Sequence, residues 1–251
     1  MRLSGNTVLI TGGASGIGFA LAEAFLEVGS TVLICGRRAK RLDEVHKIHP
    51  EIHTRICDVS EEEDRKELAD WVAANFPSLN ILVNNAGIQR DIDFTHGIDD
   101  FMAGENEIRI NLEASIILSG LFIPHLANNT DATIINVSSG LGFVPAARMP
   151  VYSATKAGMH AFSMALRHQL SGMGIQVFEI VPPPVDTELN PAGRAARGNY
   201  KPDLSPKTFV SAVMKGLENN VFEIGYGMTE GFIHASRADL DNSFNQMNSR
   251  M

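Results

Sequence analysis

The chain of 251 residues is long enough to bury a large core within one α/β domain. Its 21 basic and 29 acidic side chains give a formal net charge of −8, which argues against nucleic acid or an anionic membrane surface as the main partner. No apolar run reaches the roughly 18 residues of a membrane span, and the first strand-like run begins too near the N-terminus for a signal peptide.

The predicted elements alternate between strands and helices along most of the chain. Short apolar runs, typical of strands covered on both faces, lie at 7–10, 31–35, 52–57, 81–83, 133–137 and 175–181. Apolar residues at helical spacing predict a helix from Ile17 to Val28, closed by Gly29, and further helices near 61–75, 105–126 and 151–171. This order predicts a Rossmann-type, doubly wound parallel sheet in three layers, as a single domain over 1–251.

Side chains that could bind a metal are present, but not in a metal-binding pattern. His46, His49 and His53 precede Cys57, yet no spacing such as H-E-x-x-H, typical of open zinc sites, appears. We therefore expect surface or packing histidines and no metal. Cys35 and Cys57 end apolar runs, so we expect both to be reduced core residues of a cytoplasmic protein.

A glycine-rich turn follows the first strand and opens the first helix. It reads Gly12-x-x-x-Gly16-x-Gly18, a different spacing from the G-x-G-x-x-G dinucleotide fingerprint. The mechanics are the same, because small residues let the backbone approach a pyrophosphate at a helix N-terminus. Asp58 after the third strand and Asn84-Asn85-Ala86-Gly87 after the fourth fall at the same edge of the sheet. The sequence therefore predicts a nucleotide site.

The end of the second strand indicates which nicotinamide cofactor is preferred. An NAD site needs a carboxylate there for the ribose hydroxyls, but Gly36 stands in that place and Arg37 and Arg38 follow. Two guanidinium groups suit a 2′-phosphate in geometry and charge. The alternative is that both are solvated loop charges continuing into Lys40 and Arg41. The missing carboxylate favours NADP(H) over NAD(H).

A tyrosine and a lysine one helical turn apart suggest proton transfer. Tyr152 and Lys156 project from the same helix face, because four residues rise about 6 Å. A lysine beside a tyrosine favours the phenolate and is expected to lower a phenol pKa that starts near 10. Such a phenol can exchange a proton with a reacting oxygen. Together with the nucleotide site, the pair predicts hydride transfer.

These motifs occur together and in a family order. T-G-x-x-x-G-x-G, N-N-A-G, Ser139 at 13 residues before Tyr152, and Y-x-x-x-K resemble the short-chain dehydrogenase/reductases over roughly residues 5–225. Several segments resemble the bacterial DltE-like oxidoreductases more closely: Ile34-Cys35-Gly36-Arg37, Ile52-His53-Thr54, Asn85-Ala86-Gly87-Ile88-Gln89 and Leu166-Arg167-His168-Gln169-Leu170.

The resemblance implies a role for each matching residue. Ser139, rather than its neighbour Ser138, would polarise the substrate carbonyl; Tyr152 would be the general acid or base. Lys156 would bind the nicotinamide ribose and lower the tyrosine pKa, and Asn111 would hold a water that links the lysine to solvent. The implied cofactor-binding set is Gly12, Ser15, Gly16, Ile17, Gly18, Arg37, Arg38, Asp58, Val59, Asn85, Ala86, Gly87, Tyr152, Lys156, Pro182, Val185 and Thr187.

One segment departs from the family pattern. Where the family carries Pro-Gly after the sixth strand, this chain has Pro182-Pro183, and proline cannot adopt a positive φ. Cofactor binding should survive, since Val185 and Thr187 remain. The expected substrate pocket is apolar, and its candidate residues are Leu141, Phe143, Val144, Met149 and Leu189.

Two further segments are expected to act around this site. Residues 188–206, rich in proline, glycine and polar side chains, suit a substrate lid, and Arg194, Arg197 and Lys201 are either attractors for an anionic substrate or solvated charges. The tail 226–251 carries Leu240, Phe244, Met247 and Met251 at helical spacing and could pack on a neighbouring subunit or shield the pocket.

The helix starting at Val151 is apolar nearly all round, which predicts a two-fold interface and a homodimer or homotetramer. The function that we expect is an NADP-dependent carbonyl reductase or alcohol dehydrogenase acting on a small molecule. Two alternatives stay open: a non-catalytic NADP(H)-binding sensor or scaffold, and an epimerase, dehydratase or enoyl reductase on the same fold. The intact Ser-Tyr-Lys set counts against the sensor.

Overall fold

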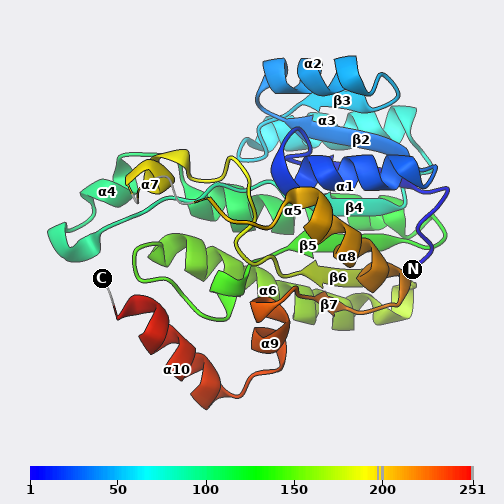
Figure 1. The fold of residues 1–251 in the computed structure, drawn as a ribbon. Coiled ribbons are helices and arrows are strands. Elements are labelled where there is room, and N and C mark those ends of the chain that lie inside the picture. The colour runs from blue at the N-terminus through cyan, green and yellow to red at the C-terminus, as the bar shows by residue number, and fades with distance from the viewer. Residues whose placement is uncertain (197, 199–200, 250–251) are drawn as a thin grey trace.

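Parallel strands form one sheet in the computed structural model, which describes residues 1–196, 198 and 201–249. Within that part of the chain the strand order is β3-β2-β1-β4-β5-β6-β7 (Figure 1). The strands are β1 (Thr7–Thr11), β2 (Thr31–Gly36), β3 (His53–Ile56), β4 (Ile81–Asn84), β5 (Thr133–Val137), β6 (Gln176–Ile180) and β7 (Glu223–Ile224). Strand order reverses between β1 and β4, where such sheets bind their ligands. The predicted doubly wound fold is confirmed.

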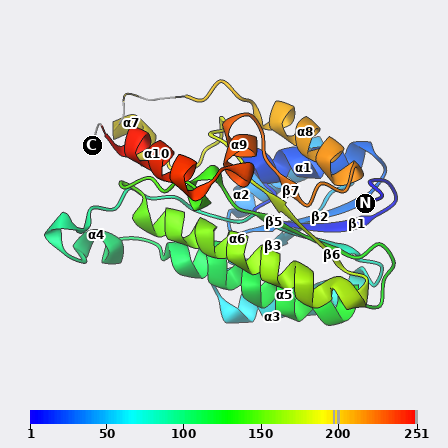
Figure 2. The same ribbon diagram turned by 90° about the horizontal axis from the view of Figure 1, so that it is seen from below.

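Helices cover both faces of the sheet, as Figure 2 shows. One face carries α1 (Gly16–Glu27), α2 (Ala39–Ile48) and α8 (Pro206–Glu218); the other carries α3 (Glu62–Asn75), α5 (Ala114–Leu126) and α6 (Pro150–Leu170). Strand alternation divides the core between them, because Val8 and Ile10 join one apolar cluster and Leu9 the other. All of β1, β4 and β5 is buried. This explains the continuous apolar runs in the sequence.

The structure contains helices that the sequence analysis does not predict. Helix α2 is largely charged and buries only Leu42 and Val45, so its periodic signal is weak. A short helix, α4 (Asp99–Met102), lies outside the sheet layers. The stretch predicted as one helix near 105–126 contains a π-helical turn at Arg109–Glu113 before α5 begins. Such turns are often found at functional sites, and this one contains Asn111.

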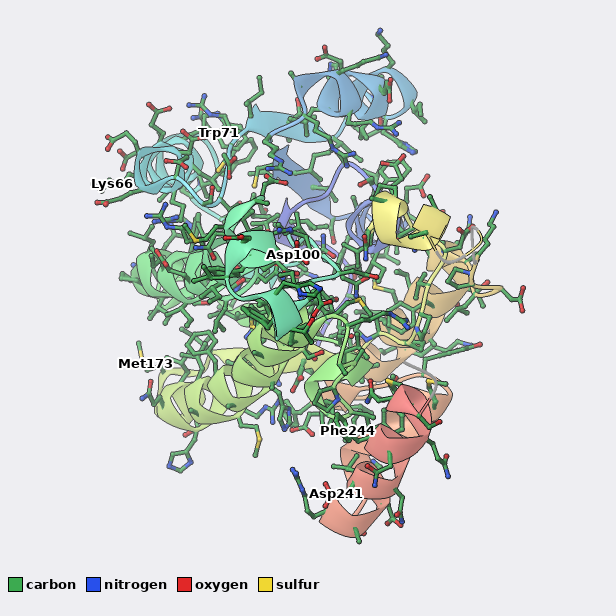
Figure 3. All side chains as sticks on the ribbon, turned by 90° about the vertical axis from the view of Figure 1, so that its left-hand side faces the viewer. Lys66, Trp71, Asp100, Met173, Asp241 and Phe244 are labelled. Atoms are coloured by element: carbon green, nitrogen blue, oxygen red, sulfur yellow. The ribbon has the colours of Figure 1, made fainter. Side chains whose placement is uncertain are left out.

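The C-terminal segment folds back onto the molecule. It contains α9 (Met228–His234) and α10 (Arg237–Asn248), the second beginning with a capping box between Ser236 and Asp239. Asn248 accepts a hydrogen bond from the Ala147 backbone at 2.7 Å and donates one to the Pro145 carbonyl at 3.1 Å. Figure 3 labels Phe244 and Asp241 on this helix at the edge of the molecule. The predicted helical tail is present, with Met251 outside the described residues.

The two cysteines lie side by side in the core. Cys35 lies one residue before the end of β2, Cys57 follows β3, and both are free and buried. The Cys57 backbone donates to the Gly36 carbonyl at 3.1 Å, which extends the strand pairing past β3. A hydrogen bond with Cys57, together with burial, raises the pKa of the Cys35 thiol.

The described ranges contain neither a membrane-spanning helix nor a cluster of metal-binding side chains. No helix there is both long enough and apolar enough to cross a membrane. No group of three or more histidine, cysteine, aspartate or glutamate side chains is arranged to hold a metal ion in those ranges. Of the histidines considered above, His49 contacts Glu23 at 3.1 Å, and His53 packs against the ring of Phe76.

Candidate active site

The glycine-rich turn is packed against the end of β4. Gly12 and Gly16 have φ of +63° and +56°, a region that glycine adopts readily. A Cβ atom on Gly18 would lie 2.5 Å from the Gly12 carbonyl oxygen, so only glycine fits there. The Asn85 side chain donates to the Thr11 and Gly12 carbonyls at 2.9 and 3.2 Å. The turn at the start of α1 is thus fixed in shape, with its helix N-terminus available to an anion.

Three arginines lie beside this turn, and each is paired with a carboxylate. Arg37 contacts Glu105, and both Arg38 and Arg41 contact Glu188. Arg38 also donates to the Ser15 hydroxyl at 2.8 Å, which places it at the start of α1. A groove of about 460 Å³ is lined by Ser15, Arg41 and Glu188 among others. The carboxylate oxygens accept from guanidinium groups as a phosphate would.

The other polar position predicted for the cofactor lies after β3. The Asp58 carboxylate accepts from the backbone and hydroxyl of Ser60 at 2.9 and 2.7 Å. The Val59 side chain is buried, and its carbonyl accepts from Arg65 at 2.7 Å. These bonds fix the loop that follows β3, a strand separated from β1 and its glycine-rich turn by β2 alone.

Serine, tyrosine and lysine meet at the carboxyl ends of β5 and β6. Ser139 follows β5, and its hydroxyl accepts from the Leu141 backbone at 3.1 Å. Pro150 starts α6, which places Tyr152 in its first turn and Lys156 one turn later. The Lys156 ammonium lies 5.6 Å from the Tyr152 ring centroid and donates to the Val137 carbonyl at 2.8 Å. All three side chains are buried, at 9%, 6% and 4% exposure respectively.

Asn111 lies beside this group in the π-helical turn. Its amide accepts from the Ile88 backbone and donates to the Ile88 carbonyl, both at 2.8 Å. A Cβ atom on Gly87 would lie 3.2 Å from Asn111 Oδ1 and 3.7 Å from Lys156 Nζ. Asn111 and Lys156 therefore flank Gly87, and the loop after β4 is held by the asparagine directly.

Similarity to known proteins shows the family of this chain. A family model described as short chain dehydrogenase matches residues 6–198. The chain belongs to this short-chain dehydrogenase family. The uncharacterized oxidoreductase DltE of Bacillus subtilis is 45% identical over 250 residues, covering 100% of this chain and 99% of the relative, which supports the DltE-like branch. An uncharacterized oxidoreductase of Staphylococcus saprophyticus is 32% identical over 87% of this chain and 93% of its own.

Solved structures of short-chain dehydrogenases share the fold. One from Burkholderia cenocepacia, in complex with NADP, is 26% identical, with a TM-score of 0.81 over 97% of this chain and 99% of its own. A serine dehydrogenase complexed with NADP⁺ is 27% identical, with a TM-score of 0.78 over 88% and 94%. A Burkholderia phymatum protein in complex with NAD reaches a TM-score of 0.83 over 97% and 96% at 20% identity, which shows the fold alone.

Burial controls the protonation of the dehydrogenase's tyrosine and lysine. It raises the pKa of Tyr152 to about 12, against the hydrogen bond with Ser139 and with a further increase from the charge of Glu107. It lowers the pKa of Lys156 to about 8, against the attraction of Glu179. The expected lowering of the tyrosine pKa is therefore wrong for this structure. The desolvation cost of a phenolate dominates, while the ammonium donates to a backbone carbonyl.

Apolar side chains surround the tyrosine. Ala146, Met149 and Tyr152 form one buried cluster, with Leu141 and Leu189 packed against it. The other two predicted pocket residues lie outside it. Phe143 lies against the ring of His160 with centroids 4.5 Å apart, and Val144 is fully buried. Ala146 was not predicted, because a lone alanine in a loop carries no signal.

The proline-rich segment after β6 returns the chain to the glycine-rich turn. The Pro182 carbonyl accepts from the Gly140 backbone at 3.0 Å, and the Val185 side chain is buried. Thr187 Cγ2 would lie 3.1 Å from a Cβ atom on Gly16. The segment thus lies between the two halves of the site although Pro183 replaces the family glycine. Of the expected lid, Arg197 and positions 199–200 lie outside the described residues.

Two side chains beside the site were missed by the sequence analysis. Glu179 is fully buried on β6, where it interrupts an apolar strand. His160 lies on α6, one turn beyond Lys156, and contacts Glu179 at 2.8 Å. The signal was available, since a carboxylate in a buried strand requires a partner.

Proposed function

We propose that this oxidoreductase transfers a hydride between NADP(H) and a carbonyl or secondary alcohol substrate, with Tyr152 as general acid and base. The observation that carries the proposal is the group formed by Ser139, Tyr152 and Lys156 beside the glycine-rich turn. It places a proton donor and a cofactor-binding backbone at the same edge of the sheet. The apolar cluster around Tyr152 offers a water-poor setting for the substrate.

The residues divide the reaction between them in the reductive direction. When bound, the nicotinamide would supply the hydride to the carbonyl carbon. The Ser139 hydroxyl donates a hydrogen bond to the carbonyl oxygen and polarises it. Tyr152 passes its phenolic proton to that oxygen, so the carbonyl gains a hydride and a proton and becomes an alcohol. Lys156 stabilises the phenolate left behind and, with the cofactor bound, would hold its ribose hydroxyls.

NADP(H) is the preferred cofactor in this proposal. Gly36 leaves no carboxylate at the end of β2, and Arg37 and Arg38 would exchange their ion pairs with Glu105 and Glu188 for a 2′-phosphate. Neighbours above 25% identity include complexes with NADP. Kinetics with both cofactors test this: kcat/KM should be higher with NADPH, and Arg38→Ala should reduce that preference. Higher kcat/KM with NADH would refute it.

A substrate panel tests the reaction itself. Oxidation of NADPH is followed optically with ketones and aldehydes, and reduction of NADP⁺ with alcohols, L-serine and other small hydroxy acids. The serine dehydrogenase among the structural neighbours motivates the last group. Substrate-dependent turnover supports the proposal, and product analysis separates it from an epimerase or dehydratase, which would leave the cofactor's redox state unchanged. Cofactor binding without turnover across the panel would favour the sensor.

The proposal also covers a substrate lid, the localisation of the protein and its assembly. Residues 188–206 act as a substrate lid, and Asp186 and Lys201, paired at 3.0 Å, anchor it. The protein is a cytoplasmic homodimer or homotetramer, joined through α6, where Met164 is exposed. Light scattering at micromolar concentration tests the assembly. A monomeric mass would contradict it, and Met164→Glu should dissociate it.

A further inference from the structure

A buried carboxylate lies directly beneath the proposed catalytic group. Glu179 on β6 is 0% exposed, and both of its oxygens are engaged. One accepts from the hydroxyl of Ser138, the residue before Ser139. The other contacts His160 Nδ1 at 2.8 Å. A charge buried this deeply is costly unless its partners are well placed, so the arrangement calls for an explanation.

The partner of this carboxylate is on the same helix as the catalytic lysine. His160 is one turn beyond Lys156 on α6, and only 24% of its side chain is exposed. The Phe143 ring covers it, with centroids 4.5 Å apart. Glu179 therefore lies between strand β5, which carries the serines, and the helix that carries the tyrosine and lysine.

His160, Tyr152 and Lys156 each face different charged side chains. His160 also faces Glu223 and Arg167, which pair with each other at 3.0 Å and so largely cancel. Tyr152 faces Glu107. The Lys156 ammonium donates to the carbonyl of Val137, the residue before Ser138, so the end of β5 brings the ammonium close to the Glu179 carboxylate that Ser138 binds. The charge of Glu179 opposes the effect of burial on the pKa of Lys156. Glu179 thus contacts His160 directly and acts on Lys156 through its charge.

We propose that Glu179 is a positioning residue that keeps the Lys156 ammonium protonated inside the site, and that His160 and Ser138 fix the carboxylate for this role. Its catalytic relevance rests on the proposed function, because it acts through Lys156. Without the carboxylate, the lysine would face burial alone and lose its proton at lower pH. The hydrogen bond with Ser138 also ties the end of β5 to β6 next to Ser139.

Nuclear magnetic resonance tests the proposal without a substrate. Lysine side chains are labelled with ¹³C at Cε and titrated from pH 6 to 11 (roughly the range of reference lysine and buried lysine pKa values). The Lys156 signal is identified by its loss in Lys156→Arg. Glu179→Gln keeps the shape and removes the charge, so the Lys156 midpoint should fall by about one pH unit, a roughly tenfold loss of proton affinity. An unchanged midpoint would overturn the proposal.

A matched control and a second variant complete the test. Glu223→Gln removes a nearby carboxylate that pairs with Arg167 and should leave the Lys156 midpoint in place. If Glu179→Gln does not fold, the second variant is Lys156→Met, in which the titration of His160 is measured instead. Without the positive charge of Lys156 near Glu179, the pH midpoint of the His160 titration should rise. An unchanged His160 midpoint would again overturn the proposal.

Turnover gives the readout that separates this proposal from the proposed function. In Glu179→Gln the high-pH limb of kcat/KM should move to lower pH along with the lysine midpoint. A purely structural role would lower the rate at all pH values and leave the limb in place. If wild type lacks NADPH-dependent turnover but the lysine midpoint still shifts, the proposed function fails and the role of Glu179 stands.

Discussion

At the scale of single residues, burial keeps Tyr152 protonated, as the proposed reduction of a carbonyl requires. A phenol with a pKa of about 12 is fully protonated at neutral pH and ready to donate. Oxidation of an alcohol needs the phenolate instead, which is scarce until the pH is high.

Replacing Tyr152 by phenylalanine should remove the proton donor and little else. We expect turnover to fall at least about 100-fold, a typical contribution of a general acid, while the Kd for NADPH changes less than about twofold. Steady-state kinetics and cofactor fluorescence measure the two quantities. Tyr226→Phe is the matched control, because that ring packs edge-on against Phe209 in a different apolar cluster from the one around Tyr152. Near-normal turnover in Tyr152→Phe would refute the proposed acid.

The pH dependence of reduction should follow Lys156. Its pKa is lowered to about 8, so the ammonium is present below that pH and is lost as the pH rises through it. We expect kcat/KM for reduction to be flat near neutrality and to fall above about pH 8, while Tyr152 stays protonated. A pH profile with a constant-ionic-strength buffer measures this. A rate that keeps rising to pH 10 (about two units past the lysine midpoint) would contradict it.

At the scale of elements, α10 holds a loop that packs beside Tyr152. Asn248 holds the loop at 145–147, whose Ala146 packs with Met149 and Tyr152. This contact is made within the chain, so the last turn of α10 packs on the loop beside Tyr152.

Removing the Asn248 side chain should loosen that loop. Two exposed hydrogen bonds are worth roughly 1 kcal/mol together, so Asn248→Ala should raise KM about three- to tenfold and change kcat less. Asn245→Ala, an exposed position on the same helix, is the control. Equal losses of kcat in both variants would point to instability of the helix instead.

The sequence analysis was most successful where local geometry decides the structure. Tyr152 and Lys156 are one turn apart on a helix, and Ser139 follows a strand, so their convergence follows from element order. The ion pairs of the arginines could not be predicted in this way. Arg37 is 68 residues from Glu105, and Arg38 is 150 residues from Glu188, so only the folded loops bring them together. The tyrosine pKa depends on burial, which a motif does not encode.

At the scale of the whole molecule, the proposed function has a cost in stability. Shifting the Lys156 pKa from 10.5 to about 8 is equivalent to roughly 3 kcal/mol against the folded state at neutral pH. Between these pH values the unfolded chain binds the proton more tightly, so this penalty declines as the pH rises. Burial of Lys156 thus lowers the free energy of unfolding.

Lys156→Met should therefore stabilise the protein. We expect a gain of up to about 2 kcal/mol at pH 7, after loss of the hydrogen bond to Val137, and a smaller gain at pH 10. Urea unfolding at the two pH values measures it. Lys66→Met on the exposed face of α3 is the control and should change little (Figure 3). A Lys156→Met protein less stable than wild type at both pH values would contradict the prediction.

The rate at which a reagent labels the adjacent thiols of Cys35 and Cys57 should report how often the sheet opens between β2 and β3. A thiol reagent can reach them only when β2 and β3 separate, since both side chains are at most 1% exposed. Arg37 follows Cys35 by two residues, so a ligand held there must slow that separation. The labelling rate of the two cysteines should therefore fall as NADPH is added, and fall less with NADH. Cofactor preference could then be measured on the resting protein, with no reaction taking place.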